Sequence, residues 1–345
     1  MGFILGFLLI SFITTAGLLV PFINLLYKLK IQRQKQKTLD AFNRPTPIFD
    51  NHHRQKAGIP IGGGLLIIVC VTILFLFSFP ILYYFWIPIT SIYANRASEI
   101  KVLLFTFISF GLIGLYDDIK KVFMGRSEQF FGMRLRHKLV LEIILSLLAG
   151  YWLYSEVRIK IIHIPLLGVY DIGIFFIIFA AFVITAFANA FNITDGLDGL
   201  ASGVLVIALA SFWVISNSIL DTPLALFIAI WLGALIAFLY FNIYPARIFL
   251  GDVGALSFGA TFAVIGLLLG KTFSLLVIGG IFVAEITSSF LQLMSKKYRG
   301  QKLIKVAPLH LWLQQRGWHE STIVFRAWLA SIVLATLGLW FAFLN

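Results

Sequence analysis

The sequence alternates between long apolar segments and short polar loops. About ten of these segments reach the roughly 20 residues that a helix needs to cross a hydrocarbon core. They cover residues 2–27, 61–86, 100–116, 139–154, 173–190, 199–217, 224–241, 255–270, 272–292 and 322–343. Because the segments are too long for membrane strands and lack sustained polar–apolar alternation, the pattern predicts helices.

The composition supports the same class of protein. Hydrophobic residues make up 60% of the 345 residues, charged residues make up only 12%, and the mean hydropathy is +0.96. These values lie outside the usage of soluble domains, so the predicted fold is an all-α polytopic integral membrane protein with one domain over residues 1–345. Residues 157–172 alternate around Pro165 and Gly168 and predict a small hairpin between two spans.

The basic residues predict the orientation of the chain. Most of the 27 Lys and Arg residues fall in four loops, at 28–60, 117–138, 242–254 and 293–321. The positive-inside rule places these loops in the cytoplasm and both termini outside. The formal net charge of +12 then reflects topology and an affinity for anionic lipids and substrates. Nucleic-acid binding is a poor explanation, because the basic residues are scattered over membrane loops without a recognisable binding fold.

The stretch from Asn189 to Ala201 is the most informative polar segment. It places two amides, Asn189 and Asn192, and two carboxylates, Asp195 and Asp198, between two strongly apolar spans. Acid and amide groups at the end of a membrane helix are costly to desolvate, so they indicate a wet and functional setting. We therefore predict that this stretch is part of a polar active site at a membrane surface.

Further polar motifs lie in loops on the same predicted face. The pair Asp117-Asp118 follows the third span, and Asp252 lies between the seventh and eighth spans. His310 lies between the ninth and tenth spans. Randomly placed motifs would fall on both faces, so their common side predicts a single cytoplasmic cleft.

The motif Asp117-Asp118-Ile-Lys-Lys121 has two interpretations. An isolated acid pair is most often a solvated helix end. Here the pair directly follows an apolar run, so it lies at the membrane surface. Carboxylate oxygens suit Mg²⁺, and nearby lysines suit a diphosphate as point charges. The motif therefore favours phosphoryl transfer.

The remaining candidates also allow ordinary explanations. Asp252, between Gly251 and Gly254, is either a turn residue bonded to its own backbone or a metal ligand, with Phe249 available to stack on a base. A lone loop histidine such as His310 is more often ordinary than catalytic. Glu285 lies deep in the ninth span and predicts a structural, hydrogen-bonded role.

Taken in order, these motifs resemble the polyprenyl-phosphate N-acetylhexosamine-1-phosphate transferase superfamily, and more closely its phospho-N-acetylmuramoyl-pentapeptide transferase branch. The similarity extends from about residue 50 to residue 343. The segments that carry it are Lys56-Ala-Gly-Ile-Pro-Ile-Gly-Gly63, Asp117 to Lys121, Arg134 to Lys138, Asn189 to Ala201, Phe241-Asn242, Phe249 to Gly254, Val283 to Glu285, Pro308 to His310 and Gly317-Trp318.

The resemblance implies ten transmembrane helices in a bacterial plasma membrane and a cytoplasmic active site that uses Mg²⁺. The implied reaction moves phospho-N-acetylmuramoyl-pentapeptide from its UDP-linked form to undecaprenyl phosphate, which gives lipid I and UMP in peptidoglycan synthesis. The implied partners are thus a UDP-linked amino sugar, undecaprenyl phosphate and membrane lipid.

The resemblance also implies roles for individual residues. Asp252 resembles the Mg²⁺ ligand, with Asn192 as a second ligand. Asp117 resembles the residue that deprotonates or positions the lipid phosphate, with Asp118 beside it and His310 as the fourth catalytic residue. The implied substrate-binding residues are Lys56, Lys121, Lys138, Asn189, Asn192, Asp195, Asp198, Asn242 and Phe249.

One motif departs from the family pattern. The family typically carries three consecutive histidines here, whereas this chain reads His310-Leu-Trp-Leu. Two alternatives therefore stay open: the same chemistry with another UDP-N-acetylhexosamine, such as UDP-N-acetylglucosamine, and a catalytically silent relative that binds polyprenyl phosphate. A transporter fits less well, because the acids lie at helix ends on one face and no repeat is evident. Dimerisation through apolar outer helices is a further open alternative.

Overall fold

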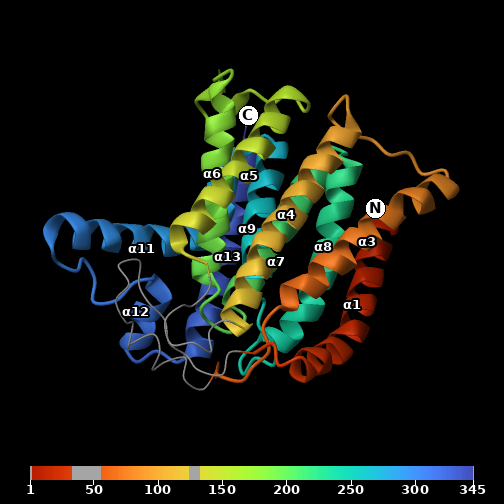
Figure 1. The fold of residues 1–345 in the computed structure, drawn as a ribbon. Helices are drawn as coiled ribbons and strands as arrows, with labels where there is room; N and C mark the ends of the chain where they lie inside the picture. The colour runs from red at the N-terminus through yellow and green to blue at the C-terminus, as the bar shows by residue number, and fades with distance from the viewer. Residues whose placement is uncertain (1, 33–55, 124–132, 345) are drawn as a thin grey trace.

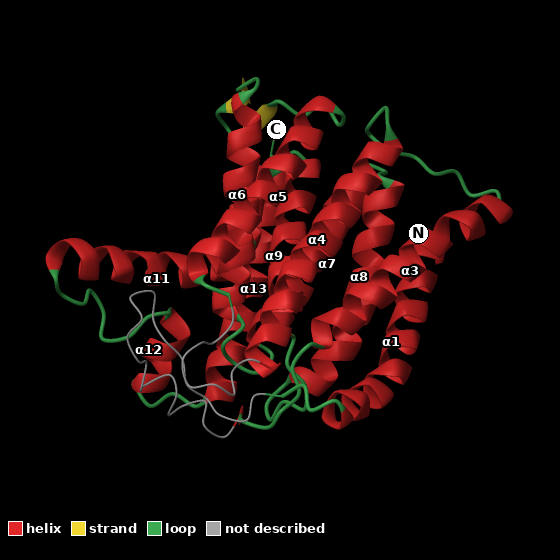
Figure 2. Ribbon diagram, in the orientation of Figure 1, coloured by secondary structure: helices red, strands yellow, loops and turns green. Residues whose placement is uncertain are grey.

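The computed structural model describes residues 2–32, 56–123 and 133–344, which are mostly helical (Figure 2). The helices are α1 (Gly2–Lys28), α3 (Gly63–Tyr84), α4 (Arg96–Phe123), α5 (Leu135–Ser155), α6 (Phe175–Thr194), α7 (Leu200–Ser218), α8 (Thr222–Asn242), α9 (Gly251–Leu268), α10 (Thr272–Ile278), α11 (Gly280–Arg299), α12 (Leu309–Gln315) and α13 (Glu320–Phe343). The two strands are β1 (Ile161–Ile164) and β2 (Gly168–Asp171).

The predicted polytopic helical architecture is confirmed. Among the described residues, nine helices are long and apolar enough to cross a membrane, namely α1, α3 to α9 and α13. The predicted span 272–292 differs from expectation, because α10 and α11 meet at an angle of 79°. As Figure 1 shows, α11 consequently points sideways out of the bundle. The described residues contain ten candidate spans only if this bent pair is counted as one.

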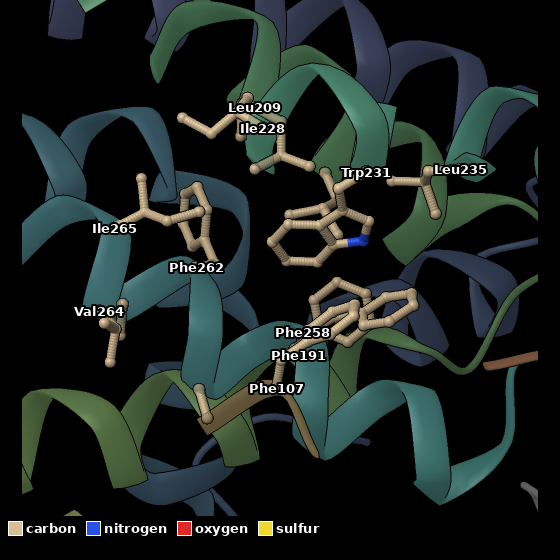
Figure 3. Close-up of a cluster of buried hydrophobic side chains, with 14 of the residues drawn as sticks. Phe107, Phe191, Leu209, Ile228, Trp231, Leu235, Phe258, Phe262, Val264 and Ile265 are labelled. Carbon is tan, nitrogen blue, oxygen red and sulfur yellow. The ribbon is translucent and has the colours of Figure 1, made fainter. Parts of the chain in front are cut away.

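The centre of the bundle is formed by α8 and α9, whose side chains are buried on nearly all sides. Around Trp231 the aromatic rings pack edge to face, with centroids 5.2 Å from Phe107 and 5.1 Å from Phe258 (Figure 3). A helix that is apolar all round is stable only where every face is covered by protein or lipid. The sequence of α8 and α9 therefore explains why they occupy the middle.

The peripheral helices expose their apolar side chains instead. Ile13 on α1 and Leu329 on α13 are both largely exposed, as are many neighbours on the same helices. In a membrane these side chains would meet lipid, where a helix satisfies all its backbone hydrogen bonds internally. The outer surface is thus suited to hydrocarbon rather than to water.

The predicted hairpin within residues 157–172 is confirmed. Strands β1 and β2 pair antiparallel, with Ile161 opposite Asp171 and Ile164 opposite Gly168. The hairpin lies near the C-terminus, at the end of the bundle opposite α12 (Figures 1 and 2). Some basic residues behind the predicted orientation lie in 33–55 and 124–132, outside the described residues.

Several motifs that were predicted to lie in loops are instead helical. Asp117 and Asp118 lie within α4, and Lys138 lies within α5. Asp252 occupies the first turn of α9. The charged side chains of Asp117, Lys138 and Asp252 are paired at these helix ends, so none of the three is buried without a counter-charge. Rigid helical backbone therefore holds the candidate site.

Candidate active site

A buried cluster of charges lies where the ends of α4, α5 and α9 meet. The Lys121 ammonium bridges two carboxylates, 2.9 Å from Asp117 Oδ2 and 2.8 Å from Asp252 Oδ2. Lys138 lies 3.4 Å from Asp117 Oδ2 and is also hydrogen-bonded to Asp252 Oδ2. The structure thus brings together two predicted catalytic aspartates and two predicted phosphate-binding lysines.

Close packing of α4 against α9 produces this cluster. A Cβ atom on Gly114 would overlap the backbone of Asp252, so only glycine allows the two helices to approach this closely. Three residues later, Asp117 faces the start of α9. The backbone N–H of Met133 donates to Asp117 Oδ1 at 2.6 Å, which ties the segment before α5 to the same carboxylate.

Asp118 has a separate position from Asp117. Its Oδ2 accepts a hydrogen bond of 3.0 Å from the backbone N–H of Val253, in the first turn of α9. Helix N-termini leave such donors without intrahelical partners. Gly251 adopts φ +79°, and a Cβ atom there would lie 2.6 Å from Asp118 Oδ2. The predicted catalytic residue Asp118 therefore anchors the helix that carries Asp252.

A second charged group surrounds the turn between α6 and α7. Lys56 Nζ lies 2.7 Å from Asp198 Oδ1 and 2.6 Å from Glu320 Oε1. The same Glu320 oxygen accepts the backbone N–H of Asp198 at 2.7 Å. Asp198 Oδ2 accepts the backbone N–H of Ala246 at 2.9 Å. Lys56 and Asp198, both predicted to bind substrate, are engaged in joining α13 to the turn.

The carboxyl of Asp195 is influenced by charges from both groups, Asp252 of the first cluster and Lys56 of the second. Desolvation by the surrounding protein raises the pKa of its carboxyl well above the ordinary range. The carboxylate of Asp252 raises this pKa further, whereas Lys56 lowers it. The α6–α7 turn and the start of α9 therefore face the same space.

The loop after α8 is hydrogen-bonded to the segment that precedes α3. Asn242 is buried, with its Oδ1 accepting from Ser202 Oγ at 2.6 Å and its Nδ2 donating to Ile248 O at 3.0 Å. The backbone N–H of Phe249 donates to Pro60 O at 2.9 Å, and its ring centroid lies 6.0 Å from Lys56 Nζ. Asn242 thus shapes the loop, and the half-buried Phe249 ring remains on its surface.

The two amides predicted on α6 lie one turn apart. Asn189 Nδ2 donates to Glu142 Oε2 at 2.5 Å and to Thr185 O at 3.0 Å. Glu142 is one turn beyond Lys138 on α5, so this contact links α6 to the cluster at Asp117. Asn192 is half-buried near the C-terminal end of α6.

His310 lies on the short helix α12 and is almost completely buried. Its Nδ1 lies 3.1 Å from Glu285 Oε2, and its backbone N–H donates to Glu285 Oε1 at 3.1 Å. The prediction that Glu285 is hydrogen-bonded is confirmed. The next two family histidines are replaced by Leu311, which is buried, and Trp312, whose ring stacks under Arg316 at 3.8 Å.

Sequence reasoning missed Glu320. It begins α13 and joins Lys56 to Asp198, although 264 residues separate it from Lys56. An acidic residue in the first turn of a helix is common because it complements the helix dipole. That local pattern conceals the long-range contact.

The donor set bears on whether this site could hold a metal. In the described segments no three His, Cys, Asp or Glu side chains are grouped as metal ligands. Ammonium groups lie between Asp117 and Asp252 instead. However, Mg²⁺ usually takes only one or two protein carboxylates and completes its shell with water and substrate phosphates. Asp117, Asp118 and Asp252 nevertheless supply several carboxylate oxygens around Lys121 and Lys138, and oxygens of this kind are the ligands that Mg²⁺ takes.

Comparisons with known proteins agree with this chemistry. Residues 100–270 match the model of glycosyl transferase family 4. A phospho-N-acetylmuramoyl-pentapeptide-transferase of Clostridium novyi is 33% identical over 83% of each chain. An enzyme of the same name from Oceanobacillus iheyensis is 36% identical over 84% of this chain and 85% of its own length. Another from Clostridium perfringens is 35% identical over 92% of each chain. This chain therefore belongs to the phospho-N-acetylmuramoyl-pentapeptide-transferase family.

Proposed function

We propose that this protein transfers phospho-N-acetylmuramoyl-pentapeptide from its UDP-linked form to undecaprenyl phosphate, releasing UMP. The observation that carries the proposal is the buried cluster of Asp117, Asp252, Lys121 and Lys138 at the ends of three membrane helices. Transfer between two phosphate-bearing partners requires charge neutralisation and in-line positioning more than covalent chemistry. A cluster of this kind supplies both.

The proposed bond changes are simple. An oxygen of the lipid phosphate attacks the β-phosphorus of the UDP-linked sugar, and the bond from that phosphorus to the UMP oxygen breaks. Lys121 and Lys138, which now neutralise Asp117 and Asp252, would turn toward the diphosphate and stabilise its charge. Asp117 would orient the lipid phosphate and accept its proton when that phosphate is protonated.

The proposal includes Mg²⁺ at Asp252, with Asn192 as a second candidate ligand. When bound, the ion supplies Lewis-acid neutralisation of the diphosphate. Asp118 supports this arrangement indirectly, because its hydrogen bond to Val253 fixes the first turn of α9. Asp195, which feels the charge of Asp252, completes the acidic side of the space.

We place the nucleotide end of the UDP-linked substrate at Phe249. The Phe249 ring is a surface on which uracil could stack, and base–aromatic stacking contributes roughly 1–3 kcal/mol. Asn242 would act by holding the loop that presents Phe249, because both ends of its side chain are already hydrogen-bonded. Asn189 and Asp198 would shape the diphosphate side, while Lys56 neutralises Asp198.

The proposed setting is the bacterial plasma membrane, with this site on the cytoplasmic face and the lipid chain against the apolar surface. The positive-inside distribution of Lys and Arg supports the orientation. A polyprenyl phosphate dissolved in the bilayer can reach a site at the helix ends without leaving the membrane.

The substituted histidine motif makes another UDP-N-acetylhexosamine the second candidate substrate. The test uses purified protein in detergent with undecaprenyl phosphate and Mg²⁺. UMP release is followed in parallel with UDP-N-acetylmuramoyl-pentapeptide and with UDP-N-acetylglucosamine. We expect release with the first alone. Release with the second alone would assign the protein to the other chemistry, and release with neither would indicate a relative that only binds lipid phosphate.

A further inference from the structure

The His310 ring presents one nitrogen that the fold itself does not use. His310 Nε2 is buried and has no hydrogen-bond partner among the described residues. A buried polar atom without a partner is rare and calls for an explanation. The atom faces the α6–α7 turn, since a Cβ atom on Gly196 would lie 2.5 Å from it. Gly196 leaves room for the imidazole beside Asp195.

The other side of the ring is fully specified by Glu285. The carboxylate receives both the backbone N–H and the Nδ1 side of His310. An ionised carboxylate only accepts hydrogen bonds, so Nδ1 carries a hydrogen. This is the arrangement by which a carboxylate fixes the orientation and tautomer of an imidazole in other catalytic and metal sites.

Among the described residues, the histidines near this site other than His310 have different surroundings, and His137 is exposed in the first turn of α5. The sequence of α12 contains one histidine, followed by Leu311 and Trp312. His319, just before α13, bonds to Ser321 through Nδ1 and packs edge-on against Tyr244. The orientation of the His310 ring therefore depends on Glu285.

We propose that Glu285 is a positioning residue: it holds the His310 ring so that Nε2 faces the diphosphate site at the α6–α7 turn. The inference rests on the proposed transferase function. Glu285 itself lies on α11, against the side of the imidazole that is turned away from the α6–α7 turn, and acts only through His310.

The substitution Glu285→Gln tests this mechanism without changing the size of the side chain. The Oε1 atom of the new glutamine can still accept the backbone N–H of His310. The glutamine NH₂ group is a donor, however, so it meets the N–H of His310 Nδ1 donor to donor. The ring must then turn or move its hydrogen to Nε2. We expect kcat to fall roughly 10- to 100-fold, which is at most the lower end of the roughly 10²–10⁴-fold contribution of a positioned acid–base group, because the imidazole is misplaced rather than removed. KM for the UDP substrate should change less than about threefold.

A double-mutant cycle with His310→Ala separates positioning from a merely structural role. If Glu285 acts through the imidazole, Glu285→Gln lowers kcat in the wild-type background but not in the His310→Ala background. Equal losses in both backgrounds would overturn the proposal. So would a Glu285→Gln protein whose kcat matches wild type. If Glu285→Gln does not fold, Glu285→Asp, which keeps the charge, enters the same cycle.

Gln292 on the same helix provides the matched control. Its side chain accepts backbone N–H groups from Leu303 and Ile304 and donates to Ile304 O, which ties α11 to the segment before α12. Gln292→Met should lower thermal stability and leave kcat within about twofold. If the proposed transferase function is wrong, the wild-type protein itself will show no transfer. That result differs from a failure of the Glu285 proposal, in which the wild type is active and the variants do not behave as expected.

Discussion

Lys56 offers the sharpest test of how charge is organised around the α6–α7 turn. Its ammonium lies 2.7 Å from Asp198 and 2.6 Å from Glu320, and the three side chains are 12%, 3% and 9% exposed. At an effective dielectric constant of about 20, one such pair corresponds to about 6 kcal/mol of gross Coulomb attraction. Desolvation offsets much of this, and removing one partner of a buried pair typically costs about 3–5 kcal/mol.

We therefore expect Lys56→Met to lower the free energy of unfolding by about 3–5 kcal/mol, because two buried carboxylates lose their counter-charge. Adding Glu320→Gln should recover about 1–3 kcal/mol of that loss, as one of the two charges is then removed. The assay is denaturant titration of the purified variants in mixed micelles, with the Lys101→Met variant as a control at the Glu156 pair on the opposite end of the bundle.

A different result would refute this account of Lys56. If Lys56 served chiefly as a ligand of substrate phosphate, Lys56→Met would unfold like wild type and raise KM for the UDP substrate. Glu320→Gln would then give no recovery. Either finding would contradict the structural role assigned to the Lys56–Asp198–Glu320 group.

Three further outcomes follow from the geometry. Asp118→Ala should cost about 1–2 kcal/mol of stability, as loss of a helix cap does. Asp117→Asn should mainly lower kcat. Thermal unfolding and UMP release, both measured on each variant, separate the two effects. Gly251→Ala should destabilise by about 1–3 kcal/mol because its φ of +79° strains any side chain; a wild-type unfolding midpoint would contradict this. Chelation with EDTA should stop UMP release and added Mg²⁺ should restore it; undiminished release in EDTA would remove the metal from the mechanism.

The sequence was sufficient for the membrane architecture. Apolar length predicted every span that the structure describes, because burying about 20 residues in hydrocarbon leaves few other choices. The break between α10 and α11 was not predicted, although Gly279-Gly280 marks it. Average hydropathy does not register a change of direction between two apolar pieces.

The membership of the site was easier to predict than its internal contacts. Asp117 and Asp252 were placed on one face from loop position alone, and the structure joins them through Lys121. The anchoring bond of Asp118 could not be predicted, because it depends on how closely α4 approaches α9. Glu320 was missed for the same reason, since its partners come from distant parts of the chain.

The central claim is best tested by identifying the lipid product directly. Purified protein in liposomes would receive undecaprenyl phosphate, UDP-N-acetylmuramoyl-pentapeptide and Mg²⁺, and extracted lipids would be analysed by mass spectrometry alongside UMP. We predict one undecaprenyl-diphosphate-linked N-acetylmuramoyl-pentapeptide per UMP from the wild type and none from a folded Asp252→Asn variant. Absence of the lipid product from folded wild-type protein, or equal product from Asp252→Asn, would contradict the account.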